Sequence, residues 1–488
     1  MKKLFIAILI LSTFSACKKW LDVKPQTQIS DDDLFKTEDG FKEAVNGMYT
    51  MMSDGKLYGR ELTTGTLEVV GQGLNADALT DLGGYHQTQL YNYRDAYFLS
   101  RKDTIWKNLY GVIANANNLL AHIDNNKALF KGNNYNLIKG EALALRAFCH
   151  FDLLRLFADS YYGQTDGPGI PYSVDFSRNA PQLYKISEVV TRLVKDLTDA
   201  KTLLAGIDPI QQSGYKVGYG TVDTATENSD FELFHQYRRT HLNYYAVCGE
   251  LARVYLYAGD KTNALGNALE VINAKKFPWT KQTDMLNTDN TKRDWICYKE
   301  IIFGVYAPDQ SKPLASLLTS DGGHLFQTIA GGDALFEANT GAGGNDLRYK
   351  TWIQLQSSAT PYYRAMKYYR ADDANLYDQI VPCIRLGEMY YIAAEASFDK
   401  NPVDACNYYN TIRFNRNIGD SLKTTDKTTF LGALTREARK ELFCEGQMFY
   451  MYKRLNMPIV GASGAPIPLT KAIATWPFPD DELIYANR

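Results

Sequence analysis

The sequence predicts an all-α fold of paired helices, with long irregular loops packed on one side of the helical scaffold. The first observation is helical periodicity between residues 140 and 157, where apolar residues recur at steps of three and four: Ala142, Leu145, Cys149, Leu153 and Leu156. The second is the presence of tight turns between such segments, at 258–260 and at 399–402. The third is that segments rich in Gly, Tyr, Asn and Asp separate the helical units.

Each further helix follows from its own pattern. Ser187 is expected to cap a helix whose apolar face consists of Val190, Leu193, Leu197, Ala200 and Leu204. Residues 244–274 are expected to form two helices around the 258–260 turn. Another pair is expected to begin at Ile384, to turn at 399–402 and to resume over 403–414. Its first helix carries the apolar residues Leu386, Met389, Ala393 and Ala396.

These helix–turn–helix units resemble tetratricopeptide repeats, but they do not follow one another directly. One unit lies near 105–157, another near 185–205 and 242–258 with its return helix, and the last set spans 384–455. A single pair of helices cannot bury its apolar face alone. We therefore expect the separated units to pack together into one superhelical scaffold.

Three irregular segments interrupt these units: residues 71–98, 206–241 and 306–348. Loops of this length inside a compact domain usually carry function. The second contains the run Tyr-Lys-Val-Gly-Tyr-Gly at 215–220. The first combines polar and aromatic residues, namely Asn75, Asp77, Asp81, Tyr85, His86, Gln89, Tyr91, Asn92 and Tyr93. A helical scaffold that bears such loops is typical of a binding protein rather than of a catalyst.

The N-terminus predicts export and membrane anchoring. Lys2 and Lys3 precede an apolar run over 4–11, and Phe14-Ser15-Ala16 stands directly before Cys17. This pattern predicts a lipoprotein signal peptide over 1–16, lipidation of Cys17, and a mature chain of one domain over 17–488. Two or more acyl chains give stable anchoring. The alternative is a simply cleaved signal with a chance cysteine.

Charge and motif content argue against nucleic-acid binding and catalysis. The chain has 53 Lys and Arg against 55 Asp and Glu, without a long basic run, so no nucleic-acid partner is expected. The sequence contains no H-E-x-x-H, no G-x-S-x-G and no phosphate-binding loop. We therefore expect no enzyme activity, no cofactor and no metal ion. The charged run over 437–441 is interpreted as an ion-paired helix.

Aromatic residues make up 13% of the chain, including 34 Tyr. Accessible Tyr side chains suit stacking on sugars, although most of these residues are expected to pack between helices. The cysteines that follow Cys17 form no metal-binding or redox motif and are expected to be free and buried. They are Cys149, Cys248, Cys297, Cys383, Cys406 and Cys444.

Several short motifs together resemble the SusD/RagB family of outer-membrane lipoproteins from Bacteroidetes. They occur in the same order as in that family, from one end of the chain to the other, and no single motif is specific by itself. The matching segments are 20–25, 35–39, 47–49, 140–148, 152–157, 345–348, 385–390, 393–396, 437–442, 445–446 and 477–483.

The resemblance implies a SusD-like lipoprotein that captures oligosaccharides or other nutrient oligomers and does not cleave them. It also implies a SusC-like TonB-dependent transporter as partner, over which such a protein sits as a lid. The expected location is the outer membrane, with a lipid anchor and facing the cell exterior. The alternatives are a peptide ligand within the same family, a glycoside hydrolase, and a protein-interaction module.

The resemblance places ligand-binding aromatics in an early loop and in the region before the last repeat. In the early loop we predict Asp81, Tyr85, His86, Tyr91 and Asn92 as ligand contacts. In the later region we predict the stacking residues Trp279, Trp295 and Trp352. Core packing is an equally good interpretation of each of these aromatics. For Trp106, which lies within a helical pattern, packing is preferred.

Overall fold

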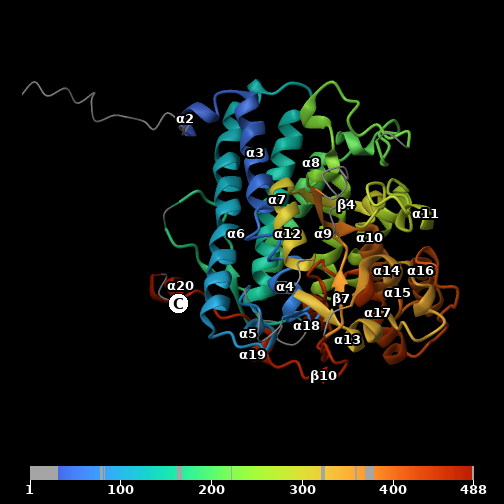
Figure 1. Cartoon of the computed structure of the whole chain (residues 1–488). Helices are drawn as coiled ribbons and strands as arrows, with labels where there is room; N and C mark the ends of the chain where they lie inside the picture. Colours follow the sequence, from blue (N-terminus) through green and yellow to red (C-terminus); the bar gives the residue numbers. More distant parts are fainter. Residues whose placement is uncertain are drawn as a thin grey trace, which may run out of the picture.

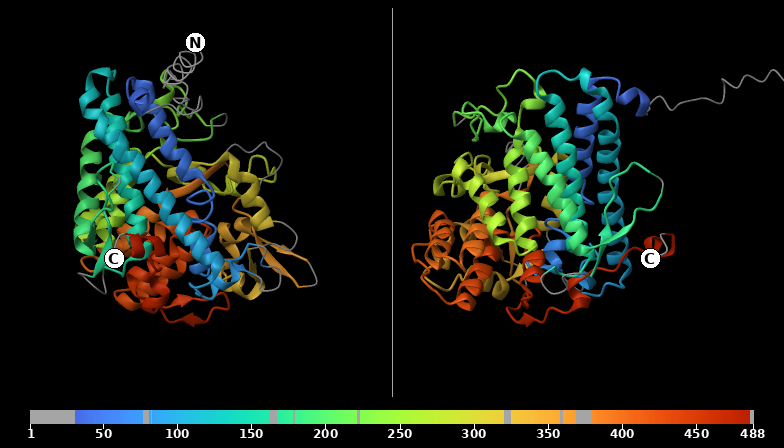
Figure 2. Two further views of the ribbon diagram at one scale, coloured as in Figure 1. Left: turned by 90° about the vertical axis from the view of Figure 1, so that its left-hand side faces the viewer. Right: turned by 180° about the vertical axis from the view of Figure 1, so that it is seen from behind.

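The computed structural model describes residues 31–76, 81, 83–161, 167–177, 179–220, 223–319, 325–357, 360–368 and 379–485. The predicted signal peptide, Cys17 and Asp77 lie outside these residues. Long helices of the N-terminal half stand side by side on one flank, and helices of the C-terminal half occupy the other (Figure 1). Figure 2 shows the two halves in contact from two further directions.

The helical scaffold is a succession of neighbouring antiparallel helices. Each helix packs against the next from α6 through α10, then α10 packs against α15 and α15 against α16, while α3 covers α6 and α7. Their bounds are α3 Glu38–Ser53, α6 Ala96–Ile123, α7 Asn134–Phe157, α8 Ile186–Leu204, α9 Tyr244–Tyr257, α10 Lys261–Ala274, α15 Leu386–Ser397 and α16 Pro402–Asn415. The predicted all-α scaffold of tetratricopeptide-like pairs is confirmed. So is the contact between separated units, because α10 meets α15 across a long intervening stretch of chain.

Two of the predicted turns have the expected polar caps. The Asp260 carboxylate accepts the Asn263 backbone N–H at the start of α10 (3.1 Å). The Asn401 side chain accepts the Asp404 N–H at the start of α16 (3.2 Å). Each cap satisfies a helix-terminal N–H group that has no partner within the helix.

Helix α7 departs from its prediction as a helix with one buried face. Every residue from Gly140 to Phe157 is buried, because α3, α6, α8 and α9 surround the helix. Its charged side chains are paired inside the core. Arg146 binds Asp196 through two 2.7 Å hydrogen bonds, and Glu141 lies 2.7 Å from Arg238.

Two helix boundaries and one loop segment also differ from the predictions. Helix α8 begins at Ile186, before Ser187, and the Glu188 carboxylate accepts the Lys185 N–H (2.8 Å) in place of a serine cap. Ile384 belongs to strand β8, so the next helix starts two residues later. The segment 306–348, predicted as irregular, contains helices and a strand. The face of α8 from Val190 to Leu204 is buried as predicted.

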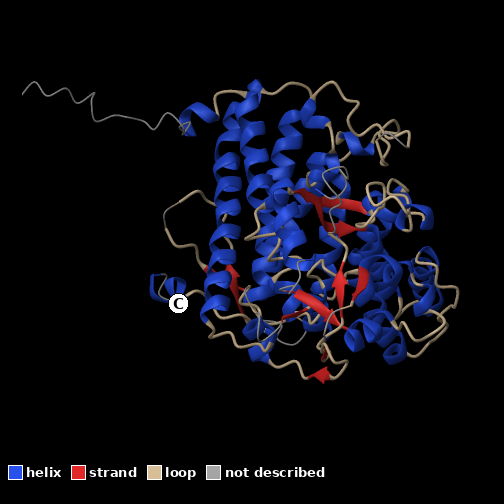
Figure 3. Cartoon of the chain, viewed as in Figure 1, coloured by secondary structure: helices blue, strands red, loops and turns tan. Residues whose placement is uncertain are grey.

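The remaining elements are short, apart from the 15-residue helix α17 (Figure 3). The α-helices are α2 Asp31–Leu34, α4 Thr66–Val70, α5 His86–Gln89, α11 Gln282–Met285, α12 Ser311–Thr319, α13 Ile329–Phe336, α14 Leu347–Trp352, α17 Lys427–Glu441, α18 Met448–Leu455, α19 Lys471–Ala474 and α20 Asp480–Tyr485. The 3₁₀ turns are Asp124–Leu129, Pro209–Gln211, Leu233–His235, Arg238–Thr240, Tyr298–Glu300, Pro308–Gln310 and Gly343–Asn345.

The strands form four small antiparallel sheets among the described residues. The largest has the order β1-β5-β7-β6, and the others pair β2 with β3, β4 with β8 and β9 with β10. The strands are β1 Asn75–Ala76, β2 Pro168–Pro171, β3 Leu183–Lys185, β4 Ile301–Tyr306, β5 Leu325–Thr328, β6 Ile353–Gln356, β7 Tyr362–Ala365, β8 Ile380–Arg385, β9 Ile459–Val460 and β10 Pro466–Ile467.

One connected hydrophobic core runs through the described chain, from Phe35 to Trp476. The six cysteines beyond Cys17 are all buried within it and free, as predicted. Within the part of the chain that the structure describes, every helix is too short or too polar to cross a bilayer.

Candidate ligand-binding face

The four-stranded sheet brings the early loop beside two later segments of the chain. Asn75 and Ala76 of β1 pair with Phe326 and Leu325 of β5, and β5 in turn pairs with β7. The Gln89 side chain fastens helix α5 to this edge, since its amide donates to the Asn75 Oδ1 (3.0 Å) and its oxygen accepts the Ala76 N–H (2.8 Å). The early loop therefore meets strands from the segment that precedes the last repeat, through β1.

Asp81 orders the early loop. Its two carboxylate oxygens accept the backbone N–H groups of Tyr85 (2.7 Å) and His86 (2.8 Å) at the start of α5. A carboxylate at this position satisfies helix-terminal N–H groups and interacts favourably with the helix dipole. The geometry makes Asp81 a capping residue of the loop, and any contact with a ligand would be additional to that role.

Tyr85 lies beneath the surface, with 3% of its area exposed. Its hydroxyl donates to the Glu61 carboxylate (2.8 Å), and the Arg101 guanidinium carbon stands 3.8 Å from its ring centroid. Burial raises the pKa of Tyr85, and the neighbouring Glu61 raises it further. Arg101 also donates to the carbonyl groups of Gly83 and Gly84. Tyr85 therefore supports the loop from within, and its ring is covered.

The other predicted loop residues differ in exposure. Tyr91 is half-buried and donates its hydroxyl to the Val70 carbonyl (3.0 Å), and burial raises its pKa. His86 is half-buried, with its Nδ1 3.4 Å from the Ala76 carbonyl oxygen. Asn92 is exposed and donates to the Gln87 side chain (2.9 Å), so its amide retains hydrogen-bonding capacity toward solvent.

The exposed aromatic residue of this loop is one that the sequence analysis did not select. Tyr97 is 63% exposed and lies in the first turn of α6, two residues after the capping residue Asp95. Its ring rests on Gly84, where a Cβ would stand only 2.5 Å from the ring carbon Cγ. One ring face is therefore covered and the other faces solvent. The sequence carried no clear signal for it, because Tyr97 and the fully buried Phe98 are neighbours in the same helical turn.

The sheet to which this loop is joined through β1 also carries half-buried and exposed side chains. On β5 and β7, Phe326 and Tyr362 are half-buried, and their ring centroids lie 5.8 Å apart. Gln354 of β6 pairs directly with Arg364 of β7. We use the term loop–sheet face for the exposed or half-buried residues His86, Leu90, Asn92, Tyr97, Phe326, Gln354, Tyr362 and Arg364. It combines ring faces with amide and guanidinium groups.

The predicted tryptophans lie elsewhere. Trp352 is 0% and Trp295 3% exposed, and Lys367 stands 4.1 Å from the Trp352 ring centroid inside the core. Neither ring presents a face to solvent, so the structure assigns both to packing instead of the predicted stacking on a ligand. Trp279 is half-buried against Tyr390, with ring centroids 5.2 Å apart. Trp106 packs 4.7 Å from the Phe157 ring, as expected.

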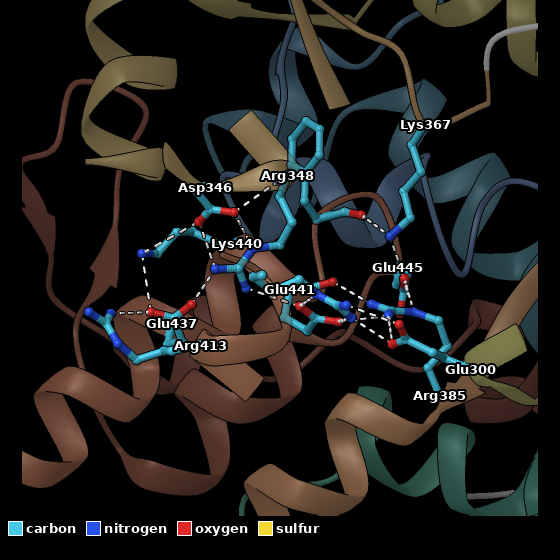
Figure 4. Close-up of polar contacts among 12 residues, drawn as sticks. Glu300, Asp346, Arg348, Lys367, Arg385, Arg413, Glu437, Lys440, Glu441 and Glu445 are labelled. Carbon is cyan, nitrogen blue, oxygen red and sulfur yellow. Dashed lines mark hydrogen bonds and ion pairs between the residues drawn. The ribbon is translucent and has the colours of Figure 1, made fainter. Parts of the chain in front are cut away.

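The charged run over 437–441 belongs to a buried ion network (Figure 4). Glu441 receives hydrogen bonds from three arginines on other segments: Arg348 (3.0 Å), Arg385 (2.7 Å) and Arg416 (2.6 and 2.9 Å). The network corrects the prediction of pairing along one helix. Only the Lys440–Glu437 contact (3.2 Å) joins two residues of α17 among the ion pairs of the described chain.

The network holds its carboxylates ionised. Burial alone would raise the pKa of Glu437, but Arg348 and Lys440 outweigh it and lower that pKa to about 2. Burial also opposes ionisation of Glu441, and Arg416 with Arg385 holds its pKa well below the ordinary value. These carboxylates are enclosed and fully engaged with cations, which suits a structural role. In the described ranges no three His, Cys, Asp or Glu side chains are grouped so that they could hold a metal ion.

Comparisons with known proteins agree with this architecture. Residues 19–211 match a family model described as "Starch-binding associating with outer membrane", and residues 270–480 match the SusD family model. Two SusD-like proteins of Formosa agariphila, P25 and P2, are 25% and 27% identical over 42% and 59% of this chain. The matches cover 38% and 50% of those two proteins, so the chain spans half or less of their length.

Solved structures have the same fold. A SusD superfamily protein from Bacteroides vulgatus aligns with a TM-score of 0.72 and 20% identity, covering 93% of this chain and 98% of that one. A SusD-like carbohydrate binding protein from the same species aligns with a TM-score of 0.71, 18% identity and coverages of 92% and 96%. A SusD superfamily protein from Bacteroides thetaiotaomicron aligns with a TM-score of 0.67 and 22% identity, covering 90% of this chain and 92% of that one. The two family models together match most of the sequence, and the chain belongs to the SusD family.

Proposed function

We propose that this chain is a non-catalytic cell-surface lipoprotein that captures oligosaccharides or polysaccharide fragments. It then delivers them to a partner TonB-dependent outer-membrane transporter. The observation that carries the proposal is the loop–sheet face, where Tyr97 keeps one ring face open to solvent and the exposed Asn92 belongs to the same loop. An aromatic face packs on the C–H surface of a sugar, and amide or charged groups bond its hydroxyls.

Within this face, Tyr97 stacks on a sugar ring, and Asn92 and His86 bond hydroxyl groups. Asp81 holds the start of α5, and Tyr85 holds the loop from below through Glu61 and Arg101. The half-buried Tyr91 positions its neighbours through the Val70 carbonyl. This assignment separates residues that touch the ligand from residues that shape the loop.

We infer that Cys17 anchors the protein to the outer membrane and that the binding face lies outside the cell, where polymer fragments arrive. The proposal of surface location rests on the residues before and at Cys17 and on the family. It predicts that Cys17→Ala releases the protein from membranes. Protease added to intact cells should digest the wild-type protein, and survival of the protein there would overturn the outward orientation.

Binding is tested with the chain carrying Cys17→Ala, against a panel of neutral and acidic polysaccharide fragments and peptides. Calorimetric binding of a carbohydrate, lost in Tyr97→Ala, supports the proposal. Binding of peptides alone would favour the peptide-binding alternative. A product that exceeds that of a heat-inactivated sample would instead indicate a glycoside hydrolase.

A further inference from the structure

A cleft rich in lysine lies between the 206–241 segment and the C-terminal end of α10. Its lining includes Lys216, Lys275, Lys276, Lys281 and Lys299, with Asp223 as the acidic residue among the described lining residues. The whole chain has a formal net charge of −2, so this cluster of lysines contrasts with the slightly negative charge of the protein. The cleft lies on segments that the loop–sheet face does not use.

The walls of the cleft are ordered by hydrogen bonds. Lys216 and Thr226 join the two sides of the loop wall: the Lys216 N–H donates to Thr226 Oγ1 (2.9 Å) and the Thr226 N–H to the Lys216 carbonyl (3.0 Å). Across the cleft, the Lys276 ammonium donates to the carbonyl oxygens of Tyr215 (2.8 Å) and Gln212 (2.9 Å). The described residues of the irregular segment that line the cleft are therefore held in place beside α10.

Lys299 forms the floor and is already neutralised. Only 5% of it is exposed, and its Nζ lies 3.1 Å from Asp284 Oδ2 and 3.6 Å from Asp223 Oδ2. Lys276 is different, because its two hydrogen bonds end on neutral carbonyls and leave its charge uncompensated. Burial lowers the pKa of Lys276. An anion beside this ammonium would favour its charged form.

The rim carries the remaining charge. Lys216, Lys275 and Lys281 are exposed, and no ion pair links any of them to a carboxylate within the residues that the structure describes. The carbonyl end of α10 attracts cations and accounts for Lys275, its C-cap residue. It does not account for Lys216 or Lys281, which come from two other segments. Three segments thus direct unneutralised ammonium groups toward one cleft.

We propose that this cleft binds the sulfate or carboxylate groups of an acidic oligosaccharide. Ammonium groups pair with oxyanions as point charges, without the fixed planar geometry that arginine imposes. Separate ammoniums on three segments suit a chain that repeats its charge along several sugars better than one small anion. The inference rests on the proposed function in taking a carbohydrate as the ligand, and it adds a second, charge-selective contact to the loop–sheet face.

The test is calorimetric titration of the Cys17→Ala chain with three probes: a dextran sulfate octasaccharide, the unsulfated octasaccharide and inorganic sulfate. We expect the sulfated oligomer to bind at least tenfold more tightly than either other probe, and its affinity to fall as salt rises. The double variant Lys216→Gln/Lys281→Gln should lose about tenfold in affinity for it. Both side chains are exposed, so the melting temperature should stay unchanged.

The matched control is Lys56→Gln/Lys107→Gln, which removes two exposed lysines outside the cleft and changes the net charge equally. It should weaken binding less than twofold. An equal loss in both double variants would overturn the site, because binding would then follow overall charge. Equally tight binding of inorganic sulfate would overturn the carbohydrate ligand. Neutral glycans report separately on the loop–sheet face through Tyr97→Ala, so failure of either proposal is distinguishable from failure of the other.

Discussion

The buried network around Glu441 and the loop–sheet face are both rich in polar side chains, but they use them in opposite ways. In the network, Arg348, Arg385 and Arg416 converge on one carboxylate that water cannot reach. At the loop–sheet face, the neighbouring Asp81 satisfies the local backbone, and the Tyr97 ring stays open to solvent. The density of charge in a sequence therefore does not locate a binding site. Side chains that stay exposed once the local hydrogen bonds are made are the better guide to such a site.

The largest effect is expected from breaking the network. Glu441→Gln removes the charge that three buried guanidinium groups share, and uncompensated buried charge is strongly unfavourable. We expect the free energy of unfolding to fall by about 3–5 kcal/mol, measured by urea denaturation. Glu43→Gln, at an exposed position of α3, is the matched control and should change it by less than about 0.5 kcal/mol. A loss under about 1 kcal/mol for Glu441→Gln would contradict the structural role.

The next effect is a loss of stability in acid. The pKa of Glu437 is lowered to about 2 in the folded chain, below its ordinary value of 4.5. A lowered pKa contributes stability that is complete above about pH 4.5 and is lost as pH falls toward 2. We expect Glu437 alone to account for about 3 kcal/mol of this change, measured as urea midpoints between pH 6 and pH 2. If Glu437→Gln shows the same acid dependence as the wild type, this assignment is wrong.

Ligand binding should depend on Tyr97, whose substitution is expected to leave the stability of the fold nearly unchanged. Tyr97→Ala removes the open ring face, and we expect about a tenfold loss of oligosaccharide affinity, about 1.4 kcal/mol, with little change in melting temperature. Phe231→Ala is the control, since that ring is fully exposed but belongs to the 206–241 segment. Equal effects of the two substitutions on affinity would remove the support for the loop–sheet face.

The smallest effect concerns the loop itself. Asp81→Ala removes two hydrogen bonds to the start of α5 and should cost about 1 kcal/mol of stability. The same change should weaken ligand binding severalfold, because Asn92 and His86 lose their fixed positions. The control is Asp81→Asn, whose side-chain oxygen still accepts one of the two N–H groups. It should retain most of the stability, and a loss equal to that of alanine would contradict the capping role.

Much of the scaffold followed from the sequence because helix pairs leave local signals. The 258–260 turn and the apolar face from Val190 to Leu204 are confirmed in the structure. The surroundings of α7 were not predictable in the same way. Its complete burial arises from four neighbouring helices, and periodicity within one segment carries no information about how many neighbours it has.

The candidate site was less predictable than the scaffold. Residue types indicated the loop over 71–98, but they did not show that Tyr85 turns inward to Glu61 while Tyr97 faces solvent. The tryptophans gave a misleading signal, since Trp352 is enclosed beside Lys367. Exposure depends on contacts between distant segments, as in the pairing of β1 with β5.

Hydrogen exchange with and without a bound oligosaccharide compares the two regions in one experiment. A saturating carbohydrate should slow amide exchange in peptides that cover residues 83–97 and 353–365, because these contain the loop and strands of the loop–sheet face. Peptides that cover 437–445 should exchange at the same rate in both states. Slower exchange confined to other segments, with no change at 83–97, would contradict the assignment of the ligand to the loop–sheet face.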